Sequence, residues 1–163
     1  MLSLSDFLNS AEQERQKKAK ACSVNLVEIF HTLENKPIPD EFKSSFVGKS
    51  TLLTYYITFK FEVTSPGSKT PHKVFIQINP DFDLRYWEGN SCRISCDCED
   101  FKYHTVYFIN QYDSLFITDR LKILYSSSLT QPPKSSAASL ICKHGIAAID
   151  YLVQNYQSIM KSI

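Results

Sequence analysis

Two short motifs constrain this chain more than any other feature of its sequence. One is a Cys-x-Cys pair at Cys96 and Cys98, and the other is a Cys-x-His pair at Cys142 and His144. Zinc prefers four thiolate or imidazole ligands in a tetrahedral arrangement, whatever their order along the chain. We therefore expect Cys96, Cys98, Cys142 and His144 to bind one structural zinc ion that organises the C-terminal half of the chain.

The remaining cysteines and histidines leave alternatives open. The N-terminus turns polar and charged too soon for a signal peptide, which indicates a cytosolic setting where cysteines stay reduced. Unconnected buried cysteines are the ordinary alternative to a metal site. His104 competes with His144 as the fourth ligand, whereas Cys22 and Cys92 are expected to be core or incidental residues.

Residues 3–22 are predicted to form a helix, because an N-terminal cap at Ser5 and an acidic-to-basic gradient match the helix dipole. Apolar positions in this segment are few, and they gather at its start. We expect residues 1–22 to be a mobile helical arm whose apolar end faces solvent until a partner covers it. That apolar cluster comprises Leu2, Leu4, Phe7 and Leu8.

Alternating apolar and polar residues over 53–63 predict a long strand with one buried face. A turn-rich segment follows, and alternation resumes over residues 74–78, so the two strands should form a hairpin. A third short strand over residues 91–95 leads into the first cysteine pair. Residues 24–33 are ambiguous between strand and helix, and Pro37 and Pro39 follow them.

The C-terminal half is predicted to be helical at both ends. Residues 100–110 have a helical composition, residues 126–139 read as a loop, and residues 143–160 form an amphipathic helix that packs back on the sheet. The expected fold class is α+β, a small antiparallel sheet with a hairpin packed on a C-terminal helix, tied by structural zinc. The arm (1–22) and an α+β zinc-binding domain (23–163) make up the chain.

The pattern Cys-x-Cys, a long spacer and Cys-x-His resembles that of SWIM-type zinc fingers. The resemblance covers about residues 72–157 and implies a ββα arrangement, with the first pair after a strand and the second opening a helix. The surrounding segments CDCEDFKYHTVY and LICKHGIAAIDYL look like a subgroup encoded by tailed bacteriophages. The sequence departs from that subgroup at His104, where Arg is expected, and at residues 139–141, where Pro-Gly is expected.

Residues next to the ligands are expected to support the metal. Phe101 and Tyr103 should cover the sulfurs, because a dry aromatic surrounding protects a thiolate site. Asp100 should accept backbone N–H groups at the start of a helix. Lys102 and Lys143 should offset the net negative charge of three thiolates.

Several function classes find no support in the sequence. A zinc shell filled by four protein ligands leaves no open position, so we expect no enzyme activity. The GKST segment at residues 48–51 lacks the earlier glycine of a phosphate-binding loop and precedes a strand. A net charge of +1 shows no concentrated basic face for nucleic acid, and no apolar run reaches the length of a membrane helix.

The sequence thus supports two functional hypotheses. The first is a non-enzymatic, zinc-stabilised structural or adaptor protein of a tailed-phage virion, assembled in the host cytoplasm, or otherwise a cytoplasmic protein. Its partners would be other virion proteins, contacted through the N-terminal arm and apolar surface. The alternative is a SWIM-type nucleic-acid-binding or regulatory module, and the neutral net charge favours the first.

Overall fold

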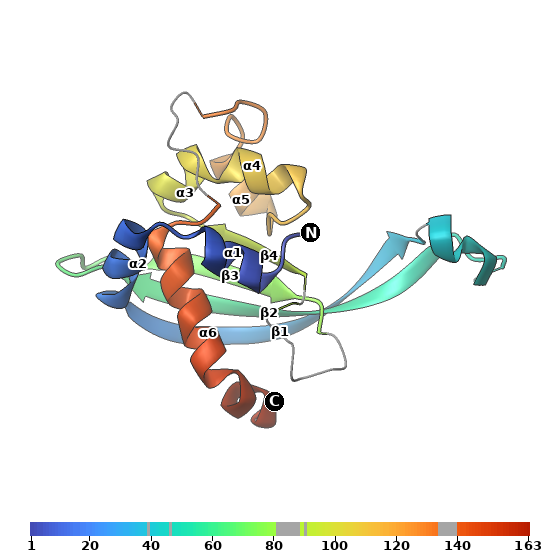
Figure 1. Cartoon of the computed structure of the whole chain (residues 1–163), viewed down its shortest axis with the longest axis horizontal. Helices are drawn as coiled ribbons and strands as arrows, with labels where there is room; N and C mark the ends of the chain where they lie inside the picture. The colour runs from blue at the N-terminus through green and yellow to red at the C-terminus, as the bar shows by residue number, and fades with distance from the viewer. Residues whose placement is uncertain (39, 46, 81–88, 90, 134–139) are drawn as a thin grey trace.

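The fold is α+β, as the sequence predicts. The computed structural model describes residues 1–38, 40–45, 47–80, 89, 91–133 and 140–163. Among these residues, four antiparallel strands form one sheet in chain order (Figure 1). The strands are β1 (Ser23–Pro37), β2 (Thr51–Thr64), β3 (His72–Ile78) and β4 (Cys92–Cys96).

β2, β3 and β4 confirm the three predicted strands, and β1 resolves the ambiguous segment 24–33 as a strand. β1 ends at Pro37, one of the two prolines expected to end this segment, whereas Pro39 lies outside the described residues. The predicted hairpin is β2–β3, in which Phe59 faces Ile76 and Phe61 faces Val74.

One face of the sheet carries the hydrophobic core. Phe59, Phe61 and Ile76 on this face are completely buried. Helix α6 (Lys143–Lys161) crosses this face (Figure 1). Tyr151 of α6 meets the Phe61 ring edge-on, with the ring centres 5.9 Å apart. Fully burying one such side chain stabilises a fold by about 1.5–3 kcal/mol, so the helix–sheet layer is the main source of stability.

The N-terminal segment forms two short helices, α1 (Leu4–Ser10) and α2 (Gln13–Lys20), rather than one helix over residues 3–22. Its apolar end does not face solvent, because Leu4 and Phe7 are completely buried in the core. These two positions lie three residues apart on one face of α1, and α1 contacts α6. The expectation for the solvent-facing cluster is therefore wrong for its two central members, and the outer two, Leu2 and Leu8, pack against the same core.

The segment after β4 is more helical than the sequence indicates. The helix predicted over residues 100–110 is broken at Thr105 into α3 (Glu99–His104) and α4 (Val106–Gln111). A further helix, α5 (Asp119–Leu124), was not predicted, and Thr118 caps it by accepting a hydrogen bond from the Leu121 N–H. Part of the predicted loop, residues 134–139, lies outside the described residues.

The outer edge of β4 is covered by two chain segments. The Cys92 N–H donates to the Leu2 carbonyl at 2.8 Å, and the Ile94 N–H donates to the Ser114 carbonyl at 2.9 Å. The Phe116 N–H returns a bond to the Ile94 carbonyl. This covering removes β4 as an open edge for pairing with other chains.

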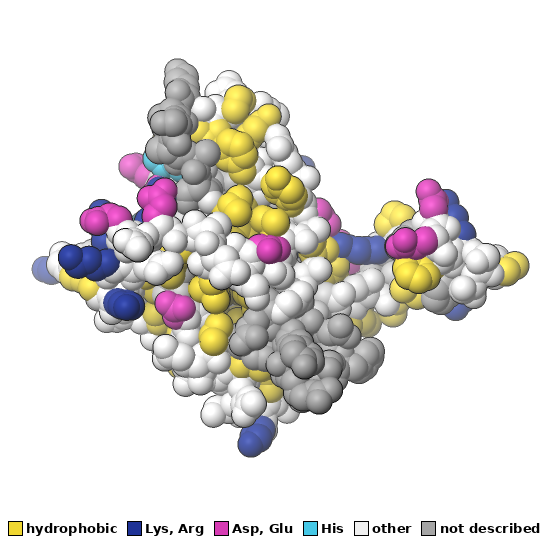
Figure 2. Space-filling view, viewed as in Figure 1, with side chains coloured by type: hydrophobic (Ala, Val, Ile, Leu, Met, Phe, Trp, Pro, Cys, Tyr) yellow, Lys and Arg dark blue, Asp and Glu magenta, His cyan; other side chains and the backbone are white. Residues whose placement is uncertain are grey.

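The β1–β2 hairpin extends well beyond the sheet. Its distal part, which we call the hairpin arm (residues 33–38, 40–45 and 47–55), projects away from the body and has the 3₁₀ helix η1 (Asp40–Ser45) near its tip (Figure 1). Acidic, basic and hydrophobic side chains lie together on its surface (Figure 2). Its exposed large hydrophobic residues are Leu33, Phe42, Val47, Leu52, Leu53 and Tyr55.

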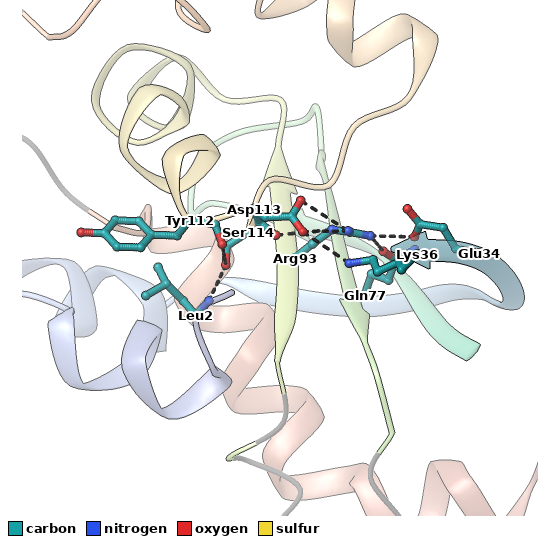
Figure 3. Close-up of polar contacts among 8 residues, drawn as sticks. All are labelled: Leu2, Glu34, Lys36, Gln77, Arg93, Tyr112, Asp113 and Ser114. Atoms are coloured by element: carbon teal, nitrogen blue, oxygen red, sulfur yellow. Dashed lines mark hydrogen bonds and ion pairs between the residues drawn. The ribbon is translucent and has the colours of Figure 1, made fainter. Parts of the chain in front are cut away.

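A polar network braces the base of the hairpin arm against the body (Figure 3). Arg93 of β4 donates to the Glu34 carboxylate of β1 and to the Gln77 side chain, both at 3.0 Å. The same guanidinium contacts the Asp113 carboxylate at 3.1 Å, and Lys36 of β1 reaches Asp113 at 3.4 Å. Because Arg93 is only 12% exposed, these bonds fix the direction in which the arm leaves the sheet.

Among the described residues, no helix combines the length and the apolar character needed to cross a membrane.

Candidate metal centre

The structure brings the four predicted ligands together at the junction of β4, α3 and α6. Cys96 ends β4, Cys98 precedes α3, Cys142 precedes α6, and His144 lies in the first turn of α6. All four are buried, and their potential ligand atoms all lie within 4.8 Å of one another. Residues 48 positions apart in the sequence thus form one cluster that could hold a metal ion.

Two of the sulfurs also cap helices. The Cys98 Sγ accepts the Phe101 N–H and the Cys142 Sγ accepts the Gly145 N–H, each at 3.4 Å. Backbone N–H groups at a helix start carry partial positive charge, so they favour the thiolate form of each sulfur. The helix starts therefore fix the sulfur positions and stabilise the charge needed for metal binding.

Asp97, between the first two ligands, holds the turn in place. Its Oδ1 accepts the Lys73 N–H at 3.1 Å and lies 2.9 Å from His72 Nδ1, both on β3. The Asp97 N–H in turn donates to the Lys73 carbonyl at 3.3 Å. The turn between the ligands is thereby attached to the neighbouring strand, which pre-positions Cys96 and Cys98.

The His144 ring is oriented by a hydrogen bond on the side away from the cysteines. Its Nδ1 lies 4.0 Å from the Cys96 Sγ, and its Nε2 lies 2.9 Å from the Ser65 Oγ. When Nε2 carries the proton and donates to Ser65, Nδ1 keeps its lone pair for a metal. Such partners behind a histidine ligand set its tautomer and orientation. No local pattern around Ser65 indicates this role.

The separations between the potential ligand atoms can be compared with those of a tetrahedral site. A zinc–sulfur bond of about 2.3 Å and a zinc–nitrogen bond of about 2.1 Å place neighbouring tetrahedral ligands roughly 3.6–3.8 Å apart. The Cys96–His144 separation of 4.0 Å exceeds this by only a few tenths of an ångström. All separations lie within 4.8 Å, so the donors farthest apart would have to draw together by up to about 1 Å to share one ion.

The electrostatics of the cluster also favour a cation. Burial raises the pKa of the Cys96 and Cys142 thiols well above the ordinary value. Hydrogen bonds from Cys142 and then Cys96 lower the pKa of the Cys98 thiol. Metal ligation requires the thiolate form, so a divalent cation at the centre of the three sulfurs would displace their protons.

The aromatic surroundings differ in part from the prediction. Phe101 is completely buried beside the cluster, as expected. Tyr103 is 54% exposed, with its ring beneath the Lys102 ammonium at 5.1 Å, so it does not shield the sulfurs. Tyr125 is buried there instead, because its hydroxyl donates to the Cys96 carbonyl and its ring lies 6.0 Å from the Phe101 ring. Nothing in the local sequence distinguished Tyr125 from other aromatic residues.

Asp100 takes a different role from the predicted cap. Its carboxylate accepts two hydrogen bonds from Arg15 of α2, at 3.0 and 3.2 Å, and the helix cap is the Cys98 sulfur. His104 Nδ1 lies 2.8 Å from the same carboxylate, outside the ligand cluster. The structure thus groups His144, rather than His104, with the cysteines and ties the N-terminal segment to the metal centre.

The other named residues lie around the cluster without joining it. Lys143, between two ligands, is partly exposed, and Lys102 stands on α3. Cys92 is buried in β4 as a core residue, where burial raises the pKa of its thiol. Cys22 packs against the edge of the core.

Compared with protein-family models, with curated proteins and with solved structures, the chain matches none of them.

Proposed function

We propose that this chain is a non-enzymatic structural or adaptor protein, stabilised by one zinc ion, that makes protein–protein contacts within a tailed-phage virion. The observation that carries the proposal is the pairing of a closed, buried ligand cluster with an exposed hairpin arm. The cluster makes the body rigid, and the arm presents apolar residues that the body itself leaves uncovered.

Zinc is the metal that best suits these donors. Three cysteine sulfurs and one imidazole form a soft donor set that is common in structural zinc sites. Catalytic zinc keeps a position open for water or substrate, whereas four buried protein donors occupy every tetrahedral position. The donor set therefore supports a structural role and argues against a hydrolytic one.

The order of elements supports the SWIM-type assignment. Cys96 and Cys98 follow β4, and Cys142 and His144 open α6, so β3, β4 and α6 reproduce the ββα arrangement implied by the sequence resemblance. The phage subgroup and the virion location rest on the segments around the two ligand pairs. Both remain part of the proposal.

The hairpin arm replaces the N-terminal segment as the proposed contact surface. Leu4 and Phe7 of the N-terminal segment are buried, whereas Leu33, Leu53 and Val47 of the arm are 63%, 58% and 88% exposed. In the β1–β2 register Leu33 lies opposite Tyr55, so these side chains continue the apolar face of the sheet outward. Exposed apolar surface of this kind marks interaction sites.

Cross-linking mass spectrometry of purified particles from the encoding phage tests this proposal. Three lysines of the arm, Lys36, Lys43 and Lys49, are suitable for an amine-reactive cross-linker. We expect peptides of the chain in the particles and cross-links from these lysines to another chain. Particles without the chain would refute the virion role. Cross-links arising only from lysines of the body would refute the hairpin arm as the contact surface.

A second candidate function is nucleic-acid binding, which one observation favours. Lys60, Lys73 and Arg120 line one pocket on the sheet face opposite α6. Binding through phosphate contacts weakens steeply with salt. Gel-shift measurements at low and moderate salt with single- and double-stranded DNA and RNA distinguish the candidates, because tight, salt-sensitive binding would favour the nucleic-acid module.

A further inference from the structure

We propose that the tip of the hairpin arm of one molecule binds the basic pocket of a second copy of the same chain. The inference rests on the proposed role of the arm as a contact surface, and it names the partner. The two surfaces involved are the η1 segment of the arm and a pocket on the sheet face opposite α6.

The receiving surface is a pocket of about 420 Å³ between the sheet and α5. Lys60 and Lys73 come from neighbouring strands, and Arg120 comes from α5. None of these three cations has an ion-pair partner among the residues that the structure describes. Apolar lining comes from Phe75, Leu121 and Leu124.

The pocket itself contains little negative charge to balance these cations. Its one acidic residue, Asp97, is already engaged by His72 and by the Lys73 N–H. The Lys60 ammonium lies 5.8 Å from the centre of the Phe75 ring. The pocket therefore suits a ligand that joins carboxylates to an apolar group.

The tip of the arm has this combination of groups. Asp40, Glu41 and Phe42 are consecutive in η1, and Phe42 is 51% exposed. Asp40 pairs with Lys43 at 2.6 Å, but both side chains are largely exposed, so the pair contributes little and is readily exchanged. Glu41 makes no ion pair with any residue in the described ranges.

Size and charge agree between the two surfaces. Pockets of roughly 300–1,000 Å³ hold drug-sized ligands, so 420 Å³ accommodates one aromatic ring with adjoining carboxylates. The η1 segment carries two carboxylates and the Lys43 ammonium, so it has a net negative charge that can face the three cations of the pocket while Phe42 meets the apolar floor. The arm leads away from its own body (Figure 1), and the network around Arg93 braces it in that direction, so the tip is available for contact with another molecule.

Analytical ultracentrifugation of the zinc-loaded protein tests the contact. The arm variant carries Asp40→Lys and Glu41→Lys, and the pocket variant carries Lys73→Glu and Arg120→Glu. We expect the wild type to associate with rising concentration, and each variant to lose at least tenfold in association constant. A chain carrying all four reversals should regain association, because its charges are complementary again.

Lys49→Glu is the matched control, since it reverses a charge of the arm outside η1 and should leave association unchanged. Circular dichroism and zinc content show that each variant is folded. A wild type that stays monomeric up to about 1 mM, or four reversals that fail to restore association, would overturn the inference. Nucleic-acid binding lost in the pocket variant, with self-association intact, would assign the pocket to nucleic acid instead.

This experiment separates the two proposals. A monomeric wild type whose arm lysines still cross-link to a different protein in particles would refute the second copy as partner and leave the proposed function standing. Cross-links between two copies, together with charge-dependent association, support both.

Discussion

Replacing Gly145 with alanine tests how closely α6 must approach the metal centre. A Cβ at this position would lie 2.8 Å from Ile141 Cγ1, 3.1 Å from Ile141 Cδ1 and 3.3 Å from Ile94 Cδ1. Ordinary carbon contacts are about 3.5–4.0 Å, so the neighbours must move by roughly 0.7 Å or more. Ile141 directly precedes the ligand Cys142, and its displacement disturbs the cluster.

Two opposing effects set the change in the free energy of unfolding caused by Gly145→Ala. Overpacking of a core costs about 1–3 kcal/mol, and alanine gains at most about 1 kcal/mol over glycine within a helix. The gain is smaller in the first turn of α6, so we expect Gly145→Ala to lower the free energy of unfolding by about 1–2 kcal/mol. In a domain of this size each kcal/mol lowers Tm by about 2–4 °C.

Thermal and denaturant unfolding of the zinc-loaded protein provide the measurement. Ile141→Ala removes the atoms that the new Cβ would meet, so Gly145→Ala should cost less in that background than in the wild type. An equal cost in both backgrounds, or a wild type stabilised by Gly145→Ala, would refute the steric reasoning.

Three further predictions concern the metal and the N-terminal segment. Metal analysis should find about one zinc per chain, and Cys98→Ser or a strong chelator should unfold the protein, because metal affinity is folding energy; an equally stable, zinc-free wild type would contradict this. His144→Ala should lose zinc whereas His104→Ala retains it, and the opposite result would identify His104 as the fourth ligand. Phe7→Ala should cost about 3–5 kcal/mol in unfolding measurements, because its ring is fully buried, and a cost below 1 kcal/mol would show that α1 is dispensable.

The sequence predicted the elements whose signal is local. Alternation identified β2 and β3, and residues at three- and four-residue spacing identified α6. The two ligand pairs were found because each is complete within three residues. To predict that the two pairs lie together in space, only one further assumption was needed, namely that both pairs bind the same ion.

Features that depend on distant contacts were missed. Arg15 and Asp100 are 85 positions apart, and neither has a local pattern that indicates their ion pair. The burial of Phe7 was missed because residues 3–22 were taken as one helix with few apolar positions, whereas α1 alone carries Leu4, Phe7 and Leu8 and contacts α6. The hairpin arm was missed because an alternating strand reads the same whether a helix covers it or it projects into solvent.

The order of elements along the chain has a consequence for synthesis in the cell. The four strands are translated before α6, which covers their apolar face and carries Cys142 and His144. Until α6 emerges, no part of that helix covers Phe59, Phe61 and Ile76. The metal site then has only two of its four ligands, Cys96 and Cys98. A nascent chain at this stage exposes a hydrophobic sheet and the unliganded thiols of Cys96 and Cys98, a species prone to aggregation and oxidation. Chaperone binding to the growing chain, and the supply of the metal ion when α6 appears, should therefore govern the yield of folded protein.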